Sequence, residues 1–158
     1  MQKINERLPP QLQGLAELFE SLPEQERREN LVAEARSVST WFRKPAEKFL
    51  VSDDRKDPDC SDRVAIFLGY DDLTKLTIRV ELGPNVQTIT KALITILCRA
   101  LSGETPKTIL RLPSDSMQRI VGEKLSRTRS RSINYILNRL KDAARHLVEQ
   151  PNLEVSKD

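Results

Sequence analysis

Cysteine, histidine, glycine and aromatic residues are all scarce in this sequence of 158 residues. It contains two cysteines, one histidine and five glycines, and aromatic residues make up 4% of the chain. One histidine and two cysteines cannot complete a tetrahedral metal site without carboxylates, so we expect no metal site. The glycines are scattered and form no glycine-rich phosphate loop, which leaves nucleotide chemistry unsupported. Two cysteines also cannot build a disulfide framework, so we interpret both as free thiols in a reducing compartment.

Long apolar runs are also lacking. No run approaches the roughly 20 residues that cross a bilayer, and Met1–Arg7 has no apolar stretch of a secretory signal. We therefore expect no transmembrane segment and a location in the cytoplasm, or in an equivalent reducing compartment such as the plastid stroma. The net charge of +3 is mild, and few aromatic residues could stack on bases, so nucleic acid is not an expected partner. With 38% hydrophobic residues, the length predicts one domain over residues 1–150 and a frayed tail over 151–158.

Helical periodicity occupies both ends of the sequence, and strand-like alternation is confined to its middle. Residues 43–62 hold two prolines and many charges and are expected to form a long, mostly irregular loop. Helices, a hairpin and then helices again predict an α+β fold with an antiparallel sheet. The expected elements are a helix over Gln11–Leu22, a second from Pro23 to Phe42, strands over Arg63–Tyr70 and Lys75–Leu82, a helix from Val86 ended by Gly103, a turn capped by Thr105, a short helix near Ser114–Lys124, and a last helix ended by Pro151.

Cys60 is the candidate catalytic residue, because it lies in a polar stretch before the first strand. A thiol acts as a nucleophile or sulfur carrier only as the thiolate. A carboxylate about 4 Å away in water opposes ionisation by roughly 1 kcal/mol. If Asp59 and Asp62 face the sulfur, the pKa of Cys60 should therefore rise. A loop cysteine without a chemical task remains the alternative interpretation.

The other polar candidates have plainer explanations. Cys98 lies among aliphatic residues and is interpreted as a small core residue. His146 is expected to have a surface or capping role, because no nucleophilic partner is identifiable nearby. Arg127, Arg129 and Arg131 alternate at the opening of the last helix, which would suit an anionic patch on a partner protein. A solvated loop is the alternative for this basic run, and RNA binding is a weaker one.

Three segments of the helical half resemble motifs of the SufE family. They are Lys91–Leu97, Gly103–Leu110 and Leu125–Arg129, and the last of them places Arg129 on the family's arginine. The opening Leu8–Pro10 and Leu31–Ala35 also resemble the family's N-terminal helices. The resemblance implies the compact α+β fold that SufE shares with IscU-like iron–sulfur scaffold proteins, an antiparallel sheet built on the hairpin at about 63–82 and packed against the N- and C-terminal helices.

The resemblance also implies a function. In the SufE family a loop cysteine accepts persulfide sulfur from a pyridoxal-phosphate cysteine desulfurase and passes it toward iron–sulfur assembly. Cys60 occupies that position here, so the expected partner is a cysteine desulfurase or another protein complex, and this chain itself is expected to bind no cofactor. The residues expected to bind the partner are Asp59, Asp62, Arg63, Arg127, Arg129 and Arg131.

Departures from the family pattern concentrate around the cysteine. Asp59 stands in place of a glycine, Asp62 in place of a serine and Ala65 in place of a tryptophan, whereas Cys60 and Val64 are retained. Two hypotheses follow. The chain is either a sulfur acceptor that uses Cys60, or a non-catalytic interaction protein on a SufE-like frame, such as an assembly factor or a subunit of a larger complex.

Overall fold

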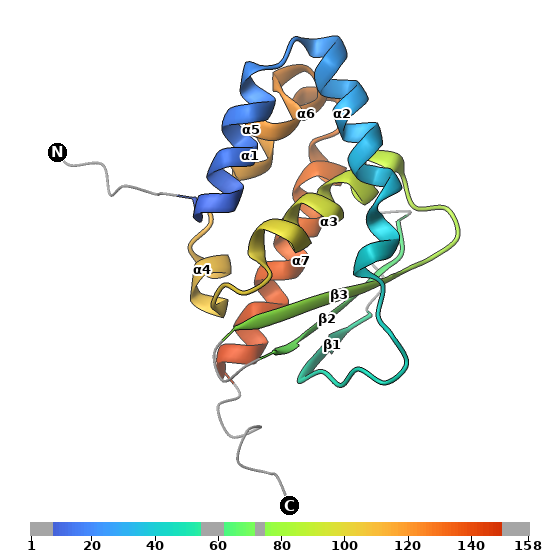
Figure 1. Cartoon of the computed structure of the whole chain (residues 1–158), viewed down its shortest axis with the longest axis vertical. Helices are drawn as coiled ribbons and strands as arrows, with labels where there is room; N and C mark the ends of the chain where they lie inside the picture. Colours follow the sequence, from blue (N-terminus) through green and yellow to red (C-terminus); the bar gives the residue numbers. More distant parts are fainter. Residues whose placement is uncertain (1–7, 55–61, 72–74, 150–158) are drawn as a thin grey trace, which may run out of the picture.

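The computed structural model describes residues 8–54, 62–71 and 75–149 (Figure 1). These residues form an α+β fold in which a three-stranded antiparallel sheet packs against helices, as the sequence predicts. In chain order the elements are α1 (Pro10–Ser21), α2 (Glu24–Arg36), the 3-10 helix η1 (Val38–Trp41), β1 (Val51–Asp53), β2 (Val64–Tyr70), β3 (Leu76–Leu82), α3 (Thr88–Leu101), α4 (Pro106–Leu110), α5 (Ser116–Val121), α6 (Glu123–Thr128) and α7 (Ser130–Glu149).

The sheet has the order β1-β2-β3, and both pairs are antiparallel. The predicted hairpin of β2 and β3 is confirmed, and β3 alternates buried and more exposed residues as expected. The strand β1 was missed within the expected irregular loop. It has three residues, and only one of them is strongly apolar, so the local sequence gives no clear strand pattern. The strand is stabilised instead by its antiparallel pairing with β2, in which Val51 lies opposite Leu68 and Asp53 lies opposite Ile66.

Helices α3 and α7 cover one face of the sheet, and α1 and α2 lie beyond them with α5 and α6 (Figure 1). Ten of the fourteen residues of α3 are buried, and one connected hydrophobic core extends from α1 to α7. Cys98 is 1% exposed within this core, which confirms its interpretation as a core residue. His146 is exposed in the last turn of α7, as expected for a surface residue.

The second helix is shorter than the sequence predicts. It begins at Glu24, after Pro23 as its N-cap, and ends at Arg36 rather than continuing to Phe42. The reason lies at the outer edge of β3, where Phe42 forms an isolated bridge with Val80 and the backbone N–H of Arg43 donates to the Val80 carbonyl at 3.1 Å. Phe42 is consequently 38% exposed instead of joining a helical stripe. The helix ends here because the following residues form hydrogen bonds with the free edge of β3.

Two of the predicted helix boundaries are confirmed around α4. Gly103 follows α3 with a φ of 86°, a left-handed conformation that glycine adopts without a Cβ penalty. The hydroxyl of Thr105 then accepts a hydrogen bond from the backbone N–H of Thr108 at 3.4 Å, and Pro106 occupies the first helical position.

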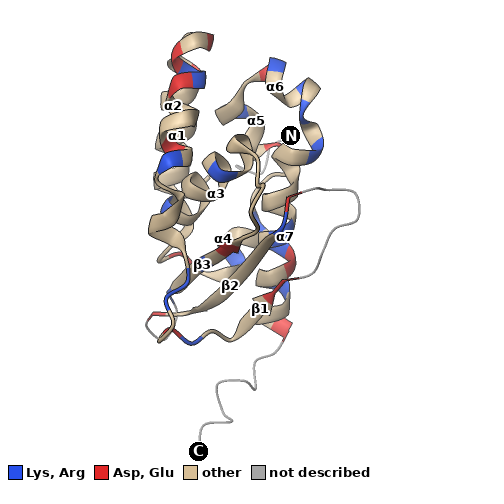
Figure 2. Cartoon of the chain, turned by 90° about the vertical axis from the view of Figure 1, so that its right-hand side faces the viewer, with Lys and Arg blue, Asp and Glu red and all other residues tan. Residues whose placement is uncertain are grey.

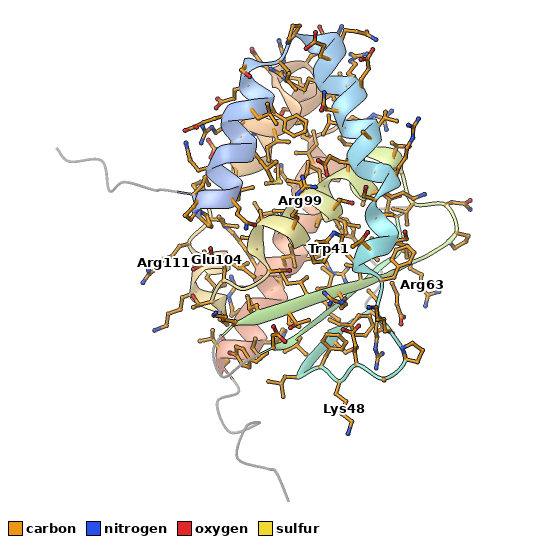
Figure 3. All side chains as sticks on the ribbon, in the orientation of Figure 1. Trp41, Lys48, Arg63, Arg99, Glu104 and Arg111 are labelled. Atoms are coloured by element: carbon orange, nitrogen blue, oxygen red, sulfur yellow. The ribbon has the colours of Figure 1, made fainter. Side chains whose placement is uncertain are left out.

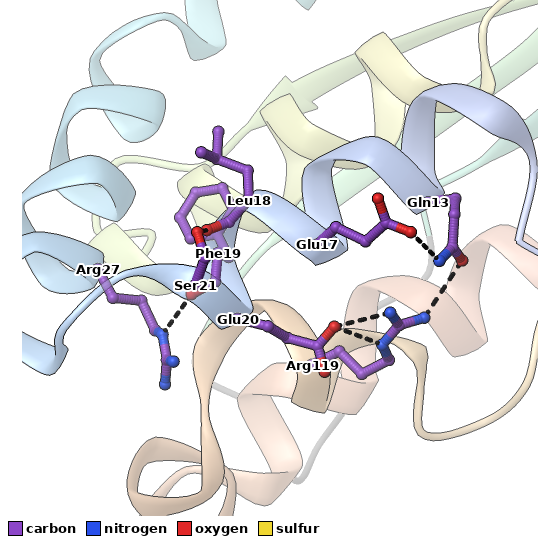
Figure 4. Close-up of polar contacts among 8 residues, drawn as sticks. All are labelled: Gln13, Glu17, Leu18, Phe19, Glu20, Ser21, Arg27 and Arg119. Atoms are coloured by element: carbon purple, nitrogen blue, oxygen red, sulfur yellow. Dashed lines mark hydrogen bonds and ion pairs between the residues drawn. The ribbon is translucent and has the colours of Figure 1, made fainter.

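The predicted short helix near Ser114–Lys124 is in fact two helices, α5 and α6, that meet at Gly122. This glycine has a φ of 89°, and a Cβ on it would lie 2.0 Å from Nη1 of Arg27. Arg27 in turn donates from Nε to the Phe19 carbonyl at 3.0 Å (Figure 4). The corner between α5 and α6 therefore fits closely against the turn between α1 and α2.

Glycine substitutions should test this close fit. We expect Gly122→Ala to destabilise the protein by about 2 kcal/mol, because it combines left-handed strain with displacement of Arg27. Gly103→Ala has open space around the added methyl and should cost about 1 kcal/mol from strain alone. Gly14→Ala in α1, also without neighbours, should stabilise by about 0.5–1 kcal/mol. Urea denaturation of the three variants measures the order, and equal effects for Gly122 and Gly103 would contradict the close packing.

An ion pair also joins α1 to α5. Arg119 donates from Nη2 to Oε1 of Glu20 at 2.7 Å, and a further bond at 3.3 Å reaches Gln13 (Figure 4). This hydrogen bonding holds the pKa of Glu20 below its ordinary value. The resulting stability is present at neutral pH and is lost as the pH falls through the lowered pKa. Because both side chains are well exposed, the contribution is small.

Candidate functional site

The candidate site lies where the chain passes from β1 to β2, because Cys60 belongs to this connection. Residues 55–61, which include Asp59 and Cys60, lie outside the described residues. The structure does describe both ends of the connection, at Asp53 and at Asp62–Val64. The candidate site is therefore built from the groups that hold these two strand ends.

A buried arginine of α7 binds both strand ends. Arg139 is 3% exposed and donates from Nη2 to the backbone carbonyls of Asp53 at 2.8 Å and Val64 at 2.9 Å. Its Nε donates to Oδ2 of Asp53 at 3.2 Å, and its Nη1 donates to the hydroxyl of Tyr135 at 2.6 Å. Tyr135 in turn donates to the Asp62 carbonyl at 3.4 Å. We call Arg139, Tyr135, Asp53, Asp62 and Val64 the Arg139 network.

Asp62 also binds the start of α3. Its Oδ1 accepts from the backbone N–H of Gln87 at 3.0 Å, and its Oδ2 accepts from the hydroxyl of Thr90. Gln87 is the N-cap residue of α3, so the carboxylate lies at the positive end of the helix dipole. Asp62 is 2% exposed. The aspartate at the family's serine position thus has a structural explanation, and its expected role in partner binding stays a prediction.

Arg63 occupies the next position and is exposed (Figure 3). Its backbone carbonyl accepts from the N–H of Gly83 at 2.8 Å. A Cβ on Gly83 would lie 2.9 Å from the Cβ of Arg63, so glycine permits this close approach of the two chains. Arg63 is thus an exposed residue next to the buried Asp62 and Val64 at the start of β2.

Arg129 is connected to the same region through Gln87. Its Nη1 donates to Oε1 of Gln87 at 2.7 Å, and Nε2 of Gln87 donates to Ser132 at 3.4 Å. The backbone N–H of Gln87 also binds Asp62, so Gln87 links Arg129 by hydrogen bonds to the end of the connection that contains Cys60.

The other two arginines of the basic run are less closely connected. Arg127 lies in α6 and pairs with Glu123 at 3.3 Å, whereas Arg131 lies exposed in the first turn of α7. The predicted run therefore does not open one helix but spans the end of α6, the corner at Arg129 and the start of α7. Lys and Arg positions recur along α6 and α7 in Figure 2.

A groove of about 410 Å³ lies between α2, the start of α3 and α6. Its floor is largely aliphatic, and Val32 within it is 41% exposed. Arg28 and Arg129 supply its positive charge. The residues that line it are Arg28, Leu31, Val32, Gln87, Thr88, Ile89, Leu125 and Arg129. The groove thus begins at the same Gln87 that holds Asp62.

Sequence reasoning missed Arg139 and Gln87. Arg139 lies on the apolar side of α7, four residues after Tyr135 and three after Ile136, so a charged residue on a buried helix face was the available signal. Gln87 carried no comparable signal, because its contact with Asp62 joins residues 25 apart in sequence.

The second cysteine is chemically unsuited to the site. Burial raises the pKa of Cys98 to about 12, so its thiol stays protonated and inaccessible at neutral pH. Over the described ranges, no group of three or more His, Cys, Asp and Glu side chains is arranged to hold a metal ion. None of the helices that the structure describes is long and apolar enough to span a membrane.

Comparison with solved structures defines the fold class. The chain is similar to a hypothetical protein from Thermus thermophilus known from a solution structure, with a TM-score of 0.68 and 23% identity. The match covers 90% of this chain and 99% of the other, and it establishes a shared α+β fold.

The particular family follows from the sequence match. Residues 13–144 match the family model described as SufE, the Fe-S metabolism associated domain. The chain therefore belongs to the SufE family, which confirms the resemblance, and its domain is one of iron–sulfur metabolism. A search of curated proteins found no match.

Proposed function

We propose that this protein is a sulfur acceptor that takes persulfide sulfur on Cys60 from a cysteine desulfurase. The observation that carries the proposal is the anchoring of both ends of the Cys60 connection by the Arg139 network, in a chain that belongs to the SufE family. The burial of Cys98 supports the assignment, because the sequence has two cysteines and the thiol of this one is protonated and inaccessible at neutral pH.

The proposed step moves one sulfur atom without net oxidation. The Cys60 thiolate attacks the outer sulfur of the desulfurase persulfide and forms a new S–S bond. The S–S bond to the desulfurase cysteine breaks, and that cysteine leaves as a thiolate. The cofactor chemistry that generates the persulfide belongs to the desulfurase. This chain supplies the attacking thiolate and the surface that receives the partner.

Incubation of the full chain with a cysteine desulfurase and cysteine tests the proposal by intact mass spectrometry. The expected result is the gain of one sulfur atom, which a thiol reductant removes. No mass gain with the desulfurase of the same organism would overturn the proposal. The non-catalytic alternative is favoured by Asp59 and by Ala65 at the family's glycine and tryptophan positions. Capture of a stable complex that does not depend on Cys60 and transfers no sulfur would support that alternative.

The surface that we propose to bind the partner surrounds the start of β2. Arg129 lies at its centre, since it borders the groove and binds Gln87 next to Asp62. Arg63, Arg127 and Arg131 extend the positive charge, and Asp59 completes the residues proposed for this surface. Asp62 is 2% exposed, so its part in this proposal is to hold the chain beneath the surface rather than to touch the partner. A desulfurase segment with apolar side chains and carboxylates would match both the aliphatic floor and the arginines.

Reversing the charge of Arg129 should weaken partner binding selectively. We expect Arg129→Glu to raise the KM for this protein as acceptor about tenfold at low salt, with kcat little changed, because a carboxylate would face an acidic partner. The difference should shrink in high salt as charges are screened. Arg111→Glu is the matched control, because Arg111 is exposed beside α4 on the opposite side of the molecule from Arg63 (Figure 3). Equal KM values for the two variants would remove Arg129 from the partner surface.

A further inference from the structure

Arg139 donates hydrogen bonds to both strand ends, at Asp53 and at Val64. A buried guanidinium loses its hydration and must be compensated by partners. Ion pairs of this kind are commonly no more stable than apolar residues of similar volume. Here the ion pair to Asp53 at 3.2 Å and the two backbone acceptors all lie at the ends of β1 and β2. The arginine thus connects two ends of the chain that flank Cys60.

We propose that Arg139 is a positioning residue that fixes the separation of the two ends of the Cys60 connection and so sets the rate of sulfur transfer. This inference rests on the proposed function. One nitrogen, Nη2, donates to carbonyls on both strand ends, so it bridges the two backbones just beyond the last sheet pair, Asp53 with Ile66. The remaining N–H groups lie in the same rigid plane, which fixes the carboxylate of Asp53 and the hydroxyl of Tyr135 relative to them.

Tyr135 holds a second backbone carbonyl at the start of β2, and this one is closer in sequence to Cys60 than the carbonyl of Val64. Its hydroxyl accepts from Arg139 and donates to the carbonyl of Asp62, two positions after Cys60. Loss of this hydroxyl would loosen only the β2 end of the connection, whereas loss of the guanidinium would loosen both ends. Substitutions of Tyr135 and Arg139 should therefore perturb the positions of the strand ends to a smaller and a larger extent.

Positioning should influence the transfer step more than the docking step. Attack on the partner's persulfide requires the thiolate to lie in line with the S–S bond, and misplacement lowers the rate of that step steeply. The surface proposed to bind the partner is centred on Arg129 and the groove, and the buried Arg139 does not line that groove. Variants of Arg139 and Tyr135 should therefore lower kcat and leave KM nearly unchanged.

The test compares Arg139→Met, Arg139→Lys and Tyr135→Phe in the full chain. We expect Arg139→Met to speed amide hydrogen exchange in β1 and the first half of β2 about tenfold, and to lower kcat by a similar factor, from loss of hydrogen bonds to a charged group. Arg139→Lys should not restore either value, because an ammonium lacks the planar fork that reaches all four acceptors. Tyr135→Phe should speed exchange only at the start of β2, about threefold.

Arg145→Met is the matched control on the same helix. Arg145 is exposed and pairs with Asp142 at the surface, so its loss should change neither exchange nor kcat. Unchanged exchange in β1 and β2 for Tyr135→Phe and Arg139→Met would overturn the inference, and so would faster exchange with an unchanged kcat. If Arg139→Met fails to fold, Tyr135→Phe decides. Absence of sulfur uptake by the wild-type chain would overturn the proposed function, and it is measured without any of these variants.

Discussion

Cys60→Ser is expected to abolish sulfur uptake completely. A serine hydroxyl ionises far above neutral pH and is not a competent nucleophile toward a persulfide under these conditions, whereas a thiolate attacks it readily. Intact mass spectrometry after incubation with desulfurase and cysteine should show the unmodified mass for this variant and one added sulfur for the wild type. Sulfur retained on Cys60→Ser would mean that another residue accepts it, and it would contradict the assignment.

Cys98→Ala is the control for that experiment. Its thiol is 1% exposed and its pKa is raised to about 12, so its removal should leave sulfur uptake intact. The lost packing should cost about 1–2 kcal/mol. The same burial simplifies a direct measurement of thiol reactivity, because Cys98 should not be alkylated in the folded wild type and any labelling is then assigned to Cys60. A pH profile of that reaction gives the pKa of Cys60, and a value above that of a free thiol would indicate that the nearby aspartates oppose ionisation.

Asp62→Ala is expected to destabilise the protein by about 3 kcal/mol, which lowers the melting temperature by about 10 °C in a domain of this size. The reason is that the backbone N–H of Gln87 and the hydroxyl of Thr90 would both lose a charged acceptor in a buried place. Thermal denaturation followed by circular dichroism measures the shift. A change below about 0.5 kcal/mol would show that the carboxylate does not cap α3.

Two control variants distinguish the loss of the α3 cap from the simple loss of a negative charge. Asp62→Ser restores the residue of the family pattern and keeps one acceptor for Gln87, so it should cost about half as much as alanine. Asp115→Ala removes an exposed aspartate that occupies the N-cap position of α5 without a side-chain cap bond, and it should have almost no effect. If the Asp62→Ser variant also takes up sulfur at the wild-type rate, the aspartate beside the cysteine is explained by stability rather than by lost chemistry.

Much of this fold could be predicted because its main elements carry strong local patterns. The apolar faces of α3 and α7, the alternation of β3 and the cap at Thr105 each depend on residues within one element. The elements that the sequence does not predict correctly depend on contacts between segments that are distant in sequence. The strand β1 exists through pairing with β2, and the early end of α2 follows from the bond between Arg43 and Val80.

The candidate site was less predictable than the fold for the same physical reason. The cysteine and the family's arginine could be identified as residues, but no local pattern places Arg129 near Asp62, since Gln87 joins them. The sequence predicts that Asp62 opposes ionisation of the thiol if its carboxylate faces the sulfur, but it does not give that orientation. The capping of α3 by Asp62 depends on residues 25 and 28 positions away. Residue type is local information, whereas the partner of a buried polar group is not.

The anchoring of both strand ends has a consequence for how this connection can evolve. Because α3 and α7 hold Asp53, Asp62 and Val64, the bonds that anchor the two strand ends come from residues outside 55–61. Doubling the number of residues in such a connection costs only about 0.6 kcal/mol of closure entropy. Insertions and substitutions could thus accumulate around Cys60 and adapt it to a different donor protein while the scaffold keeps its stability.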